Sequence, residues 1–192
     1  ACRACRWTGS LLVLEQATRR ILAAEPGALD PAGQAPVATG VQTQVGIGQY
    51  DVRVTPLQVA MVSAAVANDG VVMTPHLVQS VLGQDLSKIS ETKPEQLSKA
   101  MEPETADQLT DMMKLVVERG TGTQAAVPGT SVAGKTGTAQ APSAEGGGYD
   151  GYTASFVGVI PAEDPQFAIS VTLQRPRKGY YGGTAAAPVF SD

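Results

Sequence analysis

Residues 129–140, GTSVAGKTGTAQ, contain the side chains of this sequence that are best placed to do chemistry, and they fit two patterns at once. From Gly129 they match G-x-x-x-x-G-K-T, a loop whose backbone N–H groups and lysine hold phosphates. From Lys135 they match K-T-G-T, which combines one cation, two hydroxyls and one position without a side chain. On an extended strand, that combination can bind a carboxylate, and the glycine lets the backbone of a ligand lie close to the strand.

The flanking sequence decides against the phosphate loop. Such a loop needs a strand leading into it and a helix that begins at its lysine. Pro128 stands directly before Gly129, where the strand should be leaving, and the residues after Lys135 are too rich in proline and glycine for a helix. Residues 146–151, GGGYDG, fit the dinucleotide pattern G-x-G-x-x-G in letters but lack the same flanks. We therefore expect no bound nucleotide.

The composition narrows the ligands further. The chain has 192 residues, 43% of them hydrophobic, which is enough for one domain with its own core. Its net charge of -4 argues against nucleic acid, since phosphate backbones are bound chiefly by clustered lysine and arginine. Cys2 and Cys5 form C-x-x-C, but two thiols cannot complete a zinc site and the single histidine, His76, is remote in sequence. We expect no metal and no cofactor, and interpret His76 as structural.

Three helices are predicted before the K-T-G-T segment. Residues 11–24 have a helical composition, and a loop rich in proline and glycine follows to about Gly48. At Thr55 the sequence T-P-L-Q supplies an N-cap, a proline in the first turn and a glutamine that can complete a capping box. The helix that follows is apolar on nearly every side and should end at 68–70, Asn-Asp-Gly, so we expect it to be buried centrally.

The third helix is predicted from Pro103 to Glu118, with Gly120 as its stop. Its apolar face should consist of four residues spaced as i, i+3, i+4 and i+7, namely Leu109, Met112, Met113 and Val116.

Three strands are predicted after these helices, over 131–140, 152–160 and 166–174. Loops without helical pattern join them, which favours antiparallel pairing. The closing GGTAAAPVF predicts the start of a further helix. The fold class is therefore α+β.

Four segments, taken in order, resemble the transpeptidase domain of class B penicillin-binding proteins, in particular those of cell division. They are GIGQYDVRVTPLQVAMVSAAVANDG, ERGTGTQAAVPG, VAGKTGTAQ and GGTAAAPVF. The resemblance covers about residues 45–192, which we assign to the C-terminal part of a transpeptidase domain, and it leaves 1–44 as a poorly assigned segment. It implies helices flanking an antiparallel sheet, as in serine β-lactamases, with part of the sheet missing from this chain.

The resemblance also implies an activity. A member of this family would cross-link peptidoglycan by acyl transfer through a serine ester, and would bind a D-alanyl-D-alanine stem peptide or a β-lactam. Thr136 and Thr138 would bind the ligand's carboxylate, and Gly137 would leave room for the ligand. Lys135 would add positive potential, and the Thr138 N–H would supply half of the oxyanion hole, so both count as catalytic. Cell-division proteins are implied as candidate partners, as is a location on the extracytoplasmic face of the membrane, through an anchor not present here.

The chain departs from the family at the residues that begin this chemistry. The family uses the serine of an S-x-x-K motif as nucleophile, together with an S-x-N motif. Residues 90–93, S-E-T-K, match the first motif in letters but lie in polar sequence that predicts a loop, and no S-x-N triplet occurs. We interpret Ser90 as a solvent-exposed serine, find no nucleophile, and expect the chain alone to be inactive. A related D,D-carboxypeptidase or β-lactamase, or a non-catalytic binding module of the same fold, remains as an alternative.

Overall fold

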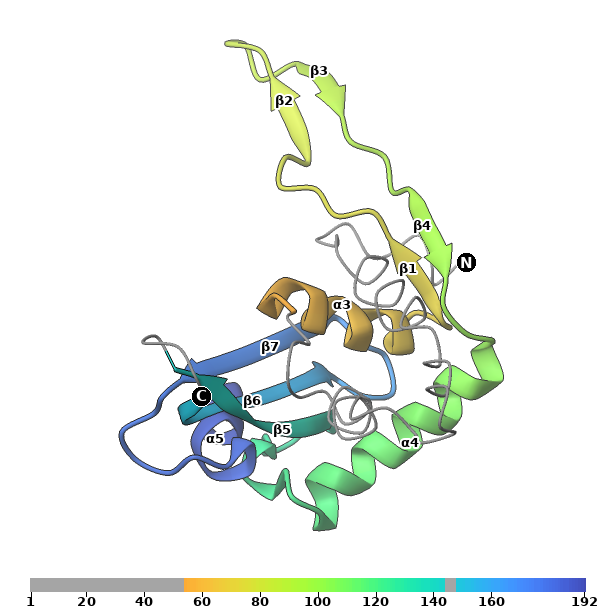
Figure 1. Cartoon of the computed structure of the whole chain (residues 1–192). Coiled ribbons are helices and arrows are strands. Elements are labelled where there is room, and N and C mark those ends of the chain that lie inside the picture. The colour runs from red at the N-terminus through yellow and green to blue at the C-terminus, as the bar shows by residue number, and fades with distance from the viewer. Residues whose placement is uncertain (1–53, 144–147) are drawn as a thin grey trace, which may run out of the picture.

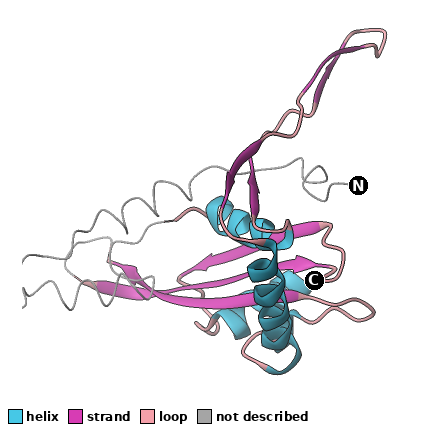
Figure 2. Ribbon diagram, turned by 90° about the vertical axis from the view of Figure 1, so that its right-hand side faces the viewer, coloured by secondary structure: helices cyan, strands magenta, loops and turns pink. Residues whose placement is uncertain are grey.

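The structure is a computed structural model that describes residues 54–143 and 148–192. Its described elements are helices packed around one antiparallel sheet, with a ribbon of short strands that projects from the body (Figures 1 and 2). The predicted α+β class is thereby confirmed. The helix predicted over 11–24, the two cysteines and the division at residue 44 lie outside the described residues.

The central sheet consists of β5 (Ala133–Pro142), β6 (Tyr149–Ile160) and β7 (Phe167–Gln174). The strand order is β5-β6-β7 and both pairs are antiparallel, as the sequence predicts. In the register of the first pair, Thr136 lies opposite Phe156 and Gly137 lies opposite Ser155. Because residues opposite each other share a face of the sheet, this register fixes which face each side chain of the K-T-G-T segment occupies.

The two faces of the sheet carry separate apolar clusters. On one face Phe156 packs edge-to-face on Phe190, with ring centroids 4.8 Å apart, and Phe190 belongs to α5 (Ala187–Ser191). On the other face Ala133 and Val159 pack with Ala67, which belongs to α3 (Pro56–Ala67). Thr136 therefore lies on the α5 face and Lys135 on the α3 face, because neighbouring residues of a strand point to opposite sides.

Helix α3 begins and ends where the sequence predicts. The Thr55 hydroxyl accepts from the Gln58 N–H at 3.2 Å, and the Gln58 side chain accepts from the Thr55 N–H at 2.5 Å, so the capping box is complete. At the other end Asn68 is the C-cap, and Asp69 and Gly70 both have positive φ, 54° and 80°. A Cβ on Gly70 would lie 2.1 Å from the Met101 carbonyl oxygen, so glycine is required there.

The prediction that α3 is a buried central helix is wrong for one of its sides. Met61 and Ala65 are buried, but Leu57 is 42% exposed and Val62 is 40% exposed. The reason is that α3 lies on the surface of the sheet, over β6 and β7 (Figure 1), and among the described residues its outer side has no comparable cover.

We expect Thr55→Ala to lower the free energy of unfolding by about 1 kcal/mol, because the capping box would lose the hydroxyl that accepts the Gln58 N–H. Urea unfolding of the protein and the variant measures the difference. Thr105→Ala, at an exposed position inside the next helix, is the matched control and should cause no loss. Similar losses for both variants would contradict the capping role.

The next helix, α4 (Pro103–Arg119), has the predicted bounds within one residue, but its buried face is rotated from the predicted one. Ala106 and Val117 are buried, whereas Met112 is 55% exposed. Met113 packs on the α3-face cluster and Val117 belongs to the α5-face cluster, so α4 spans both clusters beside the start of β5. The spacing correctly predicted a helix, but the buried face of α4 contains the small residue Ala106 and not Met112.

Residues 71–99 form a ribbon of two strand pairs that the sequence did not predict. At its base β1 (Val71–Met73) pairs with β4 (Gln96–Lys99), and beyond it β2 (Ser80–Leu82) pairs with β3 (Lys88–Glu91), all antiparallel. The ribbon projects away from the sheet (Figure 1). The loop predicted around Ser90 is therefore wrong, because Ser90 lies in β3, opposite Val81, although it is exposed as expected.

Candidate functional site

The K-T-G-T segment lies on β5, an edge strand of the central sheet in the described part of the chain. Lys135 is exposed, and the three residues that follow it are half-buried, so a ligand can reach the segment from the open edge. Because Lys135 lies in a strand, and not at the start of a helix, the phosphate-loop pattern at Gly129 has no structural counterpart, as the sequence analysis concluded. In the same way, the last three residues of GGGYDG, 149–151, belong to β6 and not to a helix.

Each hydroxyl of the segment has a hydrogen-bond partner from another element. The Thr136 Oγ1 lies 2.7 Å from the Oγ1 of Thr121, in the loop after α4. The Thr138 Oγ1 accepts a hydrogen bond from the Gly182 N–H at 3.0 Å. Gly182 opens the short helical turn η3 (Gly182–Ala186), which leads into α5 on the same face of the sheet. Thr121 and Gly182 belong to segments that resemble the family, but the sequence analysis gave neither a role in the site.

At Gly137 an added Cβ would meet a neighbouring side chain, and at Gly182 it would meet the backbone of two strands. A Cβ on Gly137 would lie 2.4 Å from the Ser155 Oγ, on the neighbouring strand. A Cβ on Gly182 would lie 2.2 Å from the Ser155 carbonyl oxygen and 2.4 Å from the Gly137 carbonyl oxygen. Contacts this short are not observed for real Cβ atoms, so η3 can approach β5 and β6 only without a side chain at Gly182.

Lys135 provides the positive charge of the segment. Its Nζ donates to the Thr136 carbonyl oxygen at 2.9 Å and lies 3.5 Å from the Thr136 Oγ1. In the described part of the chain no carboxylate pairs with it. The charge therefore remains available to attract an anion to the open edge of β5.

Two other residues singled out from the sequence lie away from this segment. Ser90 belongs to the projecting ribbon, and Figure 1 shows β3 far from β5. His76 lies in the ribbon between β1 and β2, and in the described residues its Nε2 is buried without a hydrogen-bond partner.

No group of three or more His, Cys, Asp or Glu side chains is placed to bind a metal in the described residues. Within the same residues, no helix combines the length and the apolar character needed to cross a bilayer.

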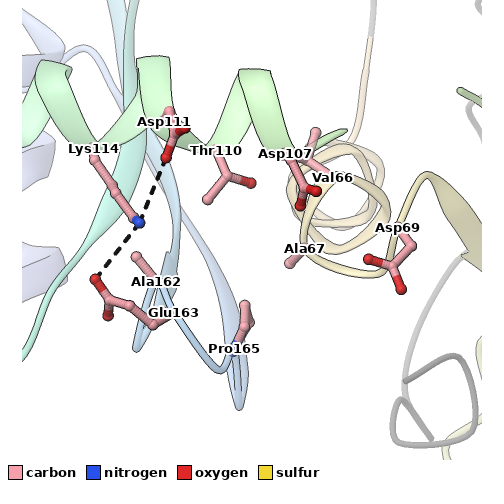
Figure 3. A pocket seen from close by; sticks show the side chains of 10 residues that line it. All are labelled: Val66, Ala67, Asp69, Asp107, Thr110, Asp111, Lys114, Ala162, Glu163 and Pro165. Atoms are coloured by element: carbon pink, nitrogen blue, oxygen red, sulfur yellow. Dashed lines mark ion pairs between the residues drawn. The ribbon is translucent and has the colours of Figure 1, made fainter. Parts of the chain in front are cut away.

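A polar cavity of about 410 Å³ lies between α3, α4 and the loop after β6, and it includes none of the K-T-G-T residues (Figure 3). In it the Lys114 Nζ lies 3.7 Å from the Asp111 Oδ1 and 3.6 Å from the Glu163 Oε1. Its lining residues are Val66, Ala67, Asp69, Asp107, Thr110, Asp111, Lys114, Ala162, Glu163 and Pro165.

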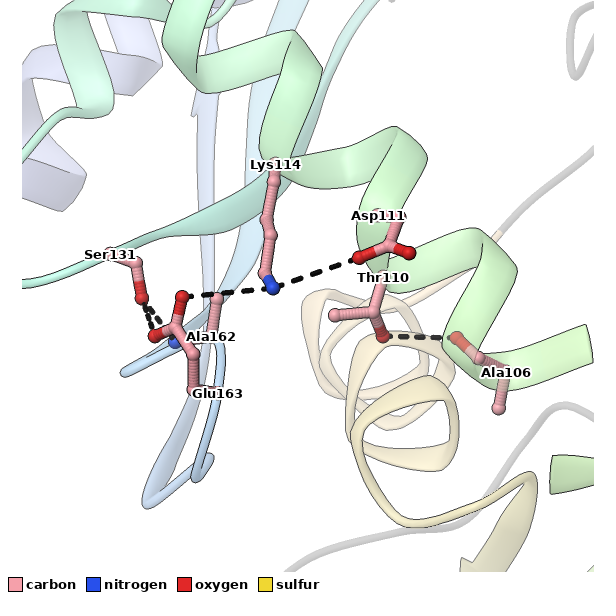
Figure 4. Close-up of polar contacts among 7 residues, drawn as sticks. All are labelled: Ala106, Thr110, Asp111, Lys114, Ser131, Ala162 and Glu163. Carbon is pink, nitrogen blue, oxygen red and sulfur yellow. Dashed lines mark hydrogen bonds and ion pairs between the residues drawn. The ribbon is translucent and has the colours of Figure 1, made fainter. Parts of the chain in front are cut away.

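Figure 4 shows the hydrogen bonds and ion pairs beside this cavity that connect the loop after β6 to the segment before β5. The Ser131 hydroxyl donates to the Glu163 carboxylate and accepts from the Ala162 N–H at 3.1 Å. The same N–H also lies 3.0 Å from the Ser131 carbonyl oxygen. The hydrogen bond from Ser131, then the backbone N–H of Glu163 and, more weakly, Lys114, hold the pKa of Glu163 below its ordinary value. The carboxylate is thus ionised at neutral pH, and the network ties together the ends of β5 and β6.

Comparison with known proteins identifies related sequences and folds. The family described as the penicillin binding protein transpeptidase domain matches residues 14–192. The peptidoglycan D,D-transpeptidase PbpA of Mycolicibacterium smegmatis is 43% identical over 149 residues, which is 74% of this chain and 29% of that protein. The chain therefore spans less than a third of the length of this relative.

Solved structures agree with this match. The crystal structure of PBPA from Mycobacterium tuberculosis has a TM-score of 0.69 and 31% identity, covering 90% of this chain and 43% of that one. Penicillin binding protein 3 of the same organism, solved as a complex with aztreonam, has a TM-score of 0.72 and 30% identity, covering 92% and 43%. Another structure, of penicillin-binding protein A from M. tuberculosis, is an acyl-enzyme complex with penicillin G.

Proposed function

Because the chain belongs to the family of penicillin-binding protein transpeptidase domains, we propose that it forms the C-terminal part of a serine-type peptidoglycan D,D-transpeptidase. The observation that supports this most directly is the K-T-G-T segment on the open edge of β5, with two hydroxyls and a lysine that no carboxylate of residues 54–143 and 148–192 pairs with. The donor substrate would be a stem peptide ending in D-alanyl-D-alanine, and β-lactams would acylate the same site.

The segment binds the ligand by its carboxylate. Thr136 and Thr138 donate hydrogen bonds to that carboxylate, and Lys135 adds the positive potential that favours an anion at the edge of the sheet. The Thr138 N–H forms half of the oxyanion hole, where it stabilises the negative oxygen of the tetrahedral intermediate. Gly137 keeps this part of the strand free of a side chain, so that the ligand's backbone can lie beside β5.

The nucleophilic serine lies outside residues 1–192. Ser90 is the one serine that fits S-x-x-K, but it is exposed on the projecting ribbon, and no S-x-N triplet occurs in the chain. In the complete reaction the serine oxygen attacks the carbonyl of the penultimate D-alanine, the terminal D-alanine leaves, and an amine of a second stem peptide then takes the acyl group. The complete protein would act outside the cell membrane, where this substrate lies, and cell-division proteins are its candidate partners.

Labelling with a fluorescent penicillin tests the proposal. The complete protein that contains this chain should form a covalent adduct that survives denaturing electrophoresis, whereas residues 1–192 alone should form none. Peptide mapping of the adduct should place the label on a serine outside these residues. A complete protein that never labels would contradict the proposed activity, and a label on Ser90 would contradict the assignment of the nucleophile.

A further inference from the structure

We propose that Thr121 is a positioning residue that orients the hydroxyl of Thr136 toward the carboxylate of the ligand. This inference rests on the proposed function, in which Thr136 donates a hydrogen bond to that carboxylate. Thr121 belongs to the loop after α4, and its Oγ1 lies 2.7 Å from the Oγ1 of Thr136. That distance is normal for a hydrogen bond between two hydroxyls.

The direction of this hydrogen bond decides whether Thr136 can bind an anion. A hydroxyl has one proton to donate and two lone pairs that accept. If Thr136 donated to Thr121, it would present only lone pairs to a carboxylate, which would repel them. If Thr121 donates, the Thr136 proton is free, and a hydrogen-bonded chain runs from Thr121 through Thr136 to the ligand. Each bond of such a chain strengthens the next.

The contact with Lys135 is compatible with this direction. Its Nζ lies 3.5 Å from the Thr136 Oγ1, and an ammonium group can donate but cannot accept. The Thr136 oxygen has two lone pairs, so it can accept from both Lys135 and the Thr121 hydroxyl at once. Its proton is then left for the carboxylate of the ligand.

Thr138 shows the same arrangement with a different donor. Its Oγ1 lies 3.0 Å from the Gly182 nitrogen, and a backbone N–H can only donate. The Thr138 oxygen must therefore accept, and its proton remains available. In our proposal the Thr121 hydroxyl donates to Thr136, just as the Gly182 N–H donates to Thr138. Both hydroxyls of the segment thus accept from a donor outside β5.

The loop that carries Thr121 is held on two sides. The N–H groups of Gly120 and Gly122 both donate to the Val116 carbonyl oxygen, at 3.1 Å and 2.9 Å. From the other side, a Cβ on Gly183 would lie 2.1 Å from the Thr121 carbonyl oxygen, so η3 closes directly on this loop. The position of the Thr121 hydroxyl is thus set by the end of α4 and by η3.

The test compares acylation by benzylpenicillin with acylation by its methyl ester, which lacks the carboxylate charge, in the complete protein that contains this chain. Thr121→Val keeps the shape of the side chain and removes the donor. We expect it to slow acylation by benzylpenicillin roughly 3- to 10-fold, the effect of one hydrogen bond between neutral groups, and to leave acylation by the ester nearly unchanged. Thr121→Ser, which keeps the hydroxyl, should restore the rate.

Thr123→Val is the matched control, because Thr123 is exposed in the same loop and its hydroxyl makes no hydrogen bond within the described residues. It should leave both rates unchanged. Equal slowing of both ligands by Thr121→Val, no slowing, or no rescue by serine would overturn the positioning role. A wild-type protein that is acylated by neither ligand would overturn the proposed function itself, and the role of Thr121 with it.

Discussion

Thr138→Val is expected to slow acylation of the complete protein by benzylpenicillin roughly 10- to 150-fold, because it removes a hydroxyl proposed to donate to the carboxylate. A hydrogen bond to a charged group contributes about 1.5–3 kcal/mol, and each 1.4 kcal/mol corresponds to about tenfold in rate. The same variant also leaves the Gly182 N–H without its acceptor. Thr136→Val should fall in the same range. The second-order acylation constant of each variant measures the effect.

The control for these two variants separates binding of the carboxylate from damage to the sheet. Thr172→Val changes a half-buried threonine of β7, on the opposite edge of the described sheet, and should leave the acylation constant unchanged. With the methyl ester as ligand, the losses in Thr136→Val and Thr138→Val should shrink. If both variants lose as much rate with the ester as with the acid, the hydroxyls do not bind the carboxylate.

Gly182→Ala is expected to be the most destabilising single substitution that we consider, with a loss of about 3 kcal/mol or more in the free energy of unfolding. The added Cβ would meet the carbonyl oxygens of Ser155 and Gly137 at 2.2 Å and 2.4 Å. Both oxygens belong to the backbone of paired strands, so they cannot move aside as a flexible side chain can. The strain should separate η3 from the sheet, and thermal unfolding of the complete protein measures the loss.

Separation of η3 should also affect the site. The Gly182 N–H would move away from the Thr138 hydroxyl, so acylation by benzylpenicillin should fall together with stability. Gly83→Ala is the matched control, since its Cβ would meet only the side chains of Asp85 and Ser87 within 3.0 Å, and these lie on the exposed ribbon. If Gly182→Ala melts at the same temperature as Gly83→Ala, the close approach of η3 to the sheet is not required for stability.

The parts of the fold that the sequence predicted are those with a local cause. Thr55 and Gln58 are three residues apart and form a capping box, so the start of α3 could be inferred directly. The alternation in β7 and the absence of helical pattern in the loops between strands predicted the antiparallel sheet in the same way. The position of the K-T-G-T segment on a strand followed from its flanks.

The ribbon was missed because its strands are only three or four residues long and mostly exposed. The strands β2, β3 and β4 have no buried residue, and so they lack the alternation of apolar and polar residues by which a strand is recognised. The face of α4 was misplaced for a related reason. Spacing predicts that a helix has an apolar face, but Ala106 was not counted in it because alanine fits both buried and exposed positions.

The contacts of the candidate site were beyond prediction because they join distant parts of the chain. Thr121 lies 15 residues before Thr136, and Gly182 lies 44 residues after Thr138. No local pattern shows that these residues meet, since their approach depends on how α4 and η3 pack against the sheet. The roles proposed for Lys135 and for the two hydroxyls stay predictions, for the acylation experiments to decide.

The base of the ribbon, where β1 pairs with β4, lies between the body of the domain and the outer part of the ribbon, where β2 pairs with β3. Val71 pairs with Lys99 and Met73 with Gln96, and the Thr74 N–H donates to the Glu95 carbonyl oxygen at 2.7 Å. These pairs fix the distance between the end of α3 and the start of α4, whatever number of residues the chain contains beyond Thr74 and Glu95. Mutations, insertions and deletions in the outer ribbon are thus uncoupled from the geometry of β5. The outer ribbon can therefore change in length and surface without moving the strand that carries the K-T-G-T segment.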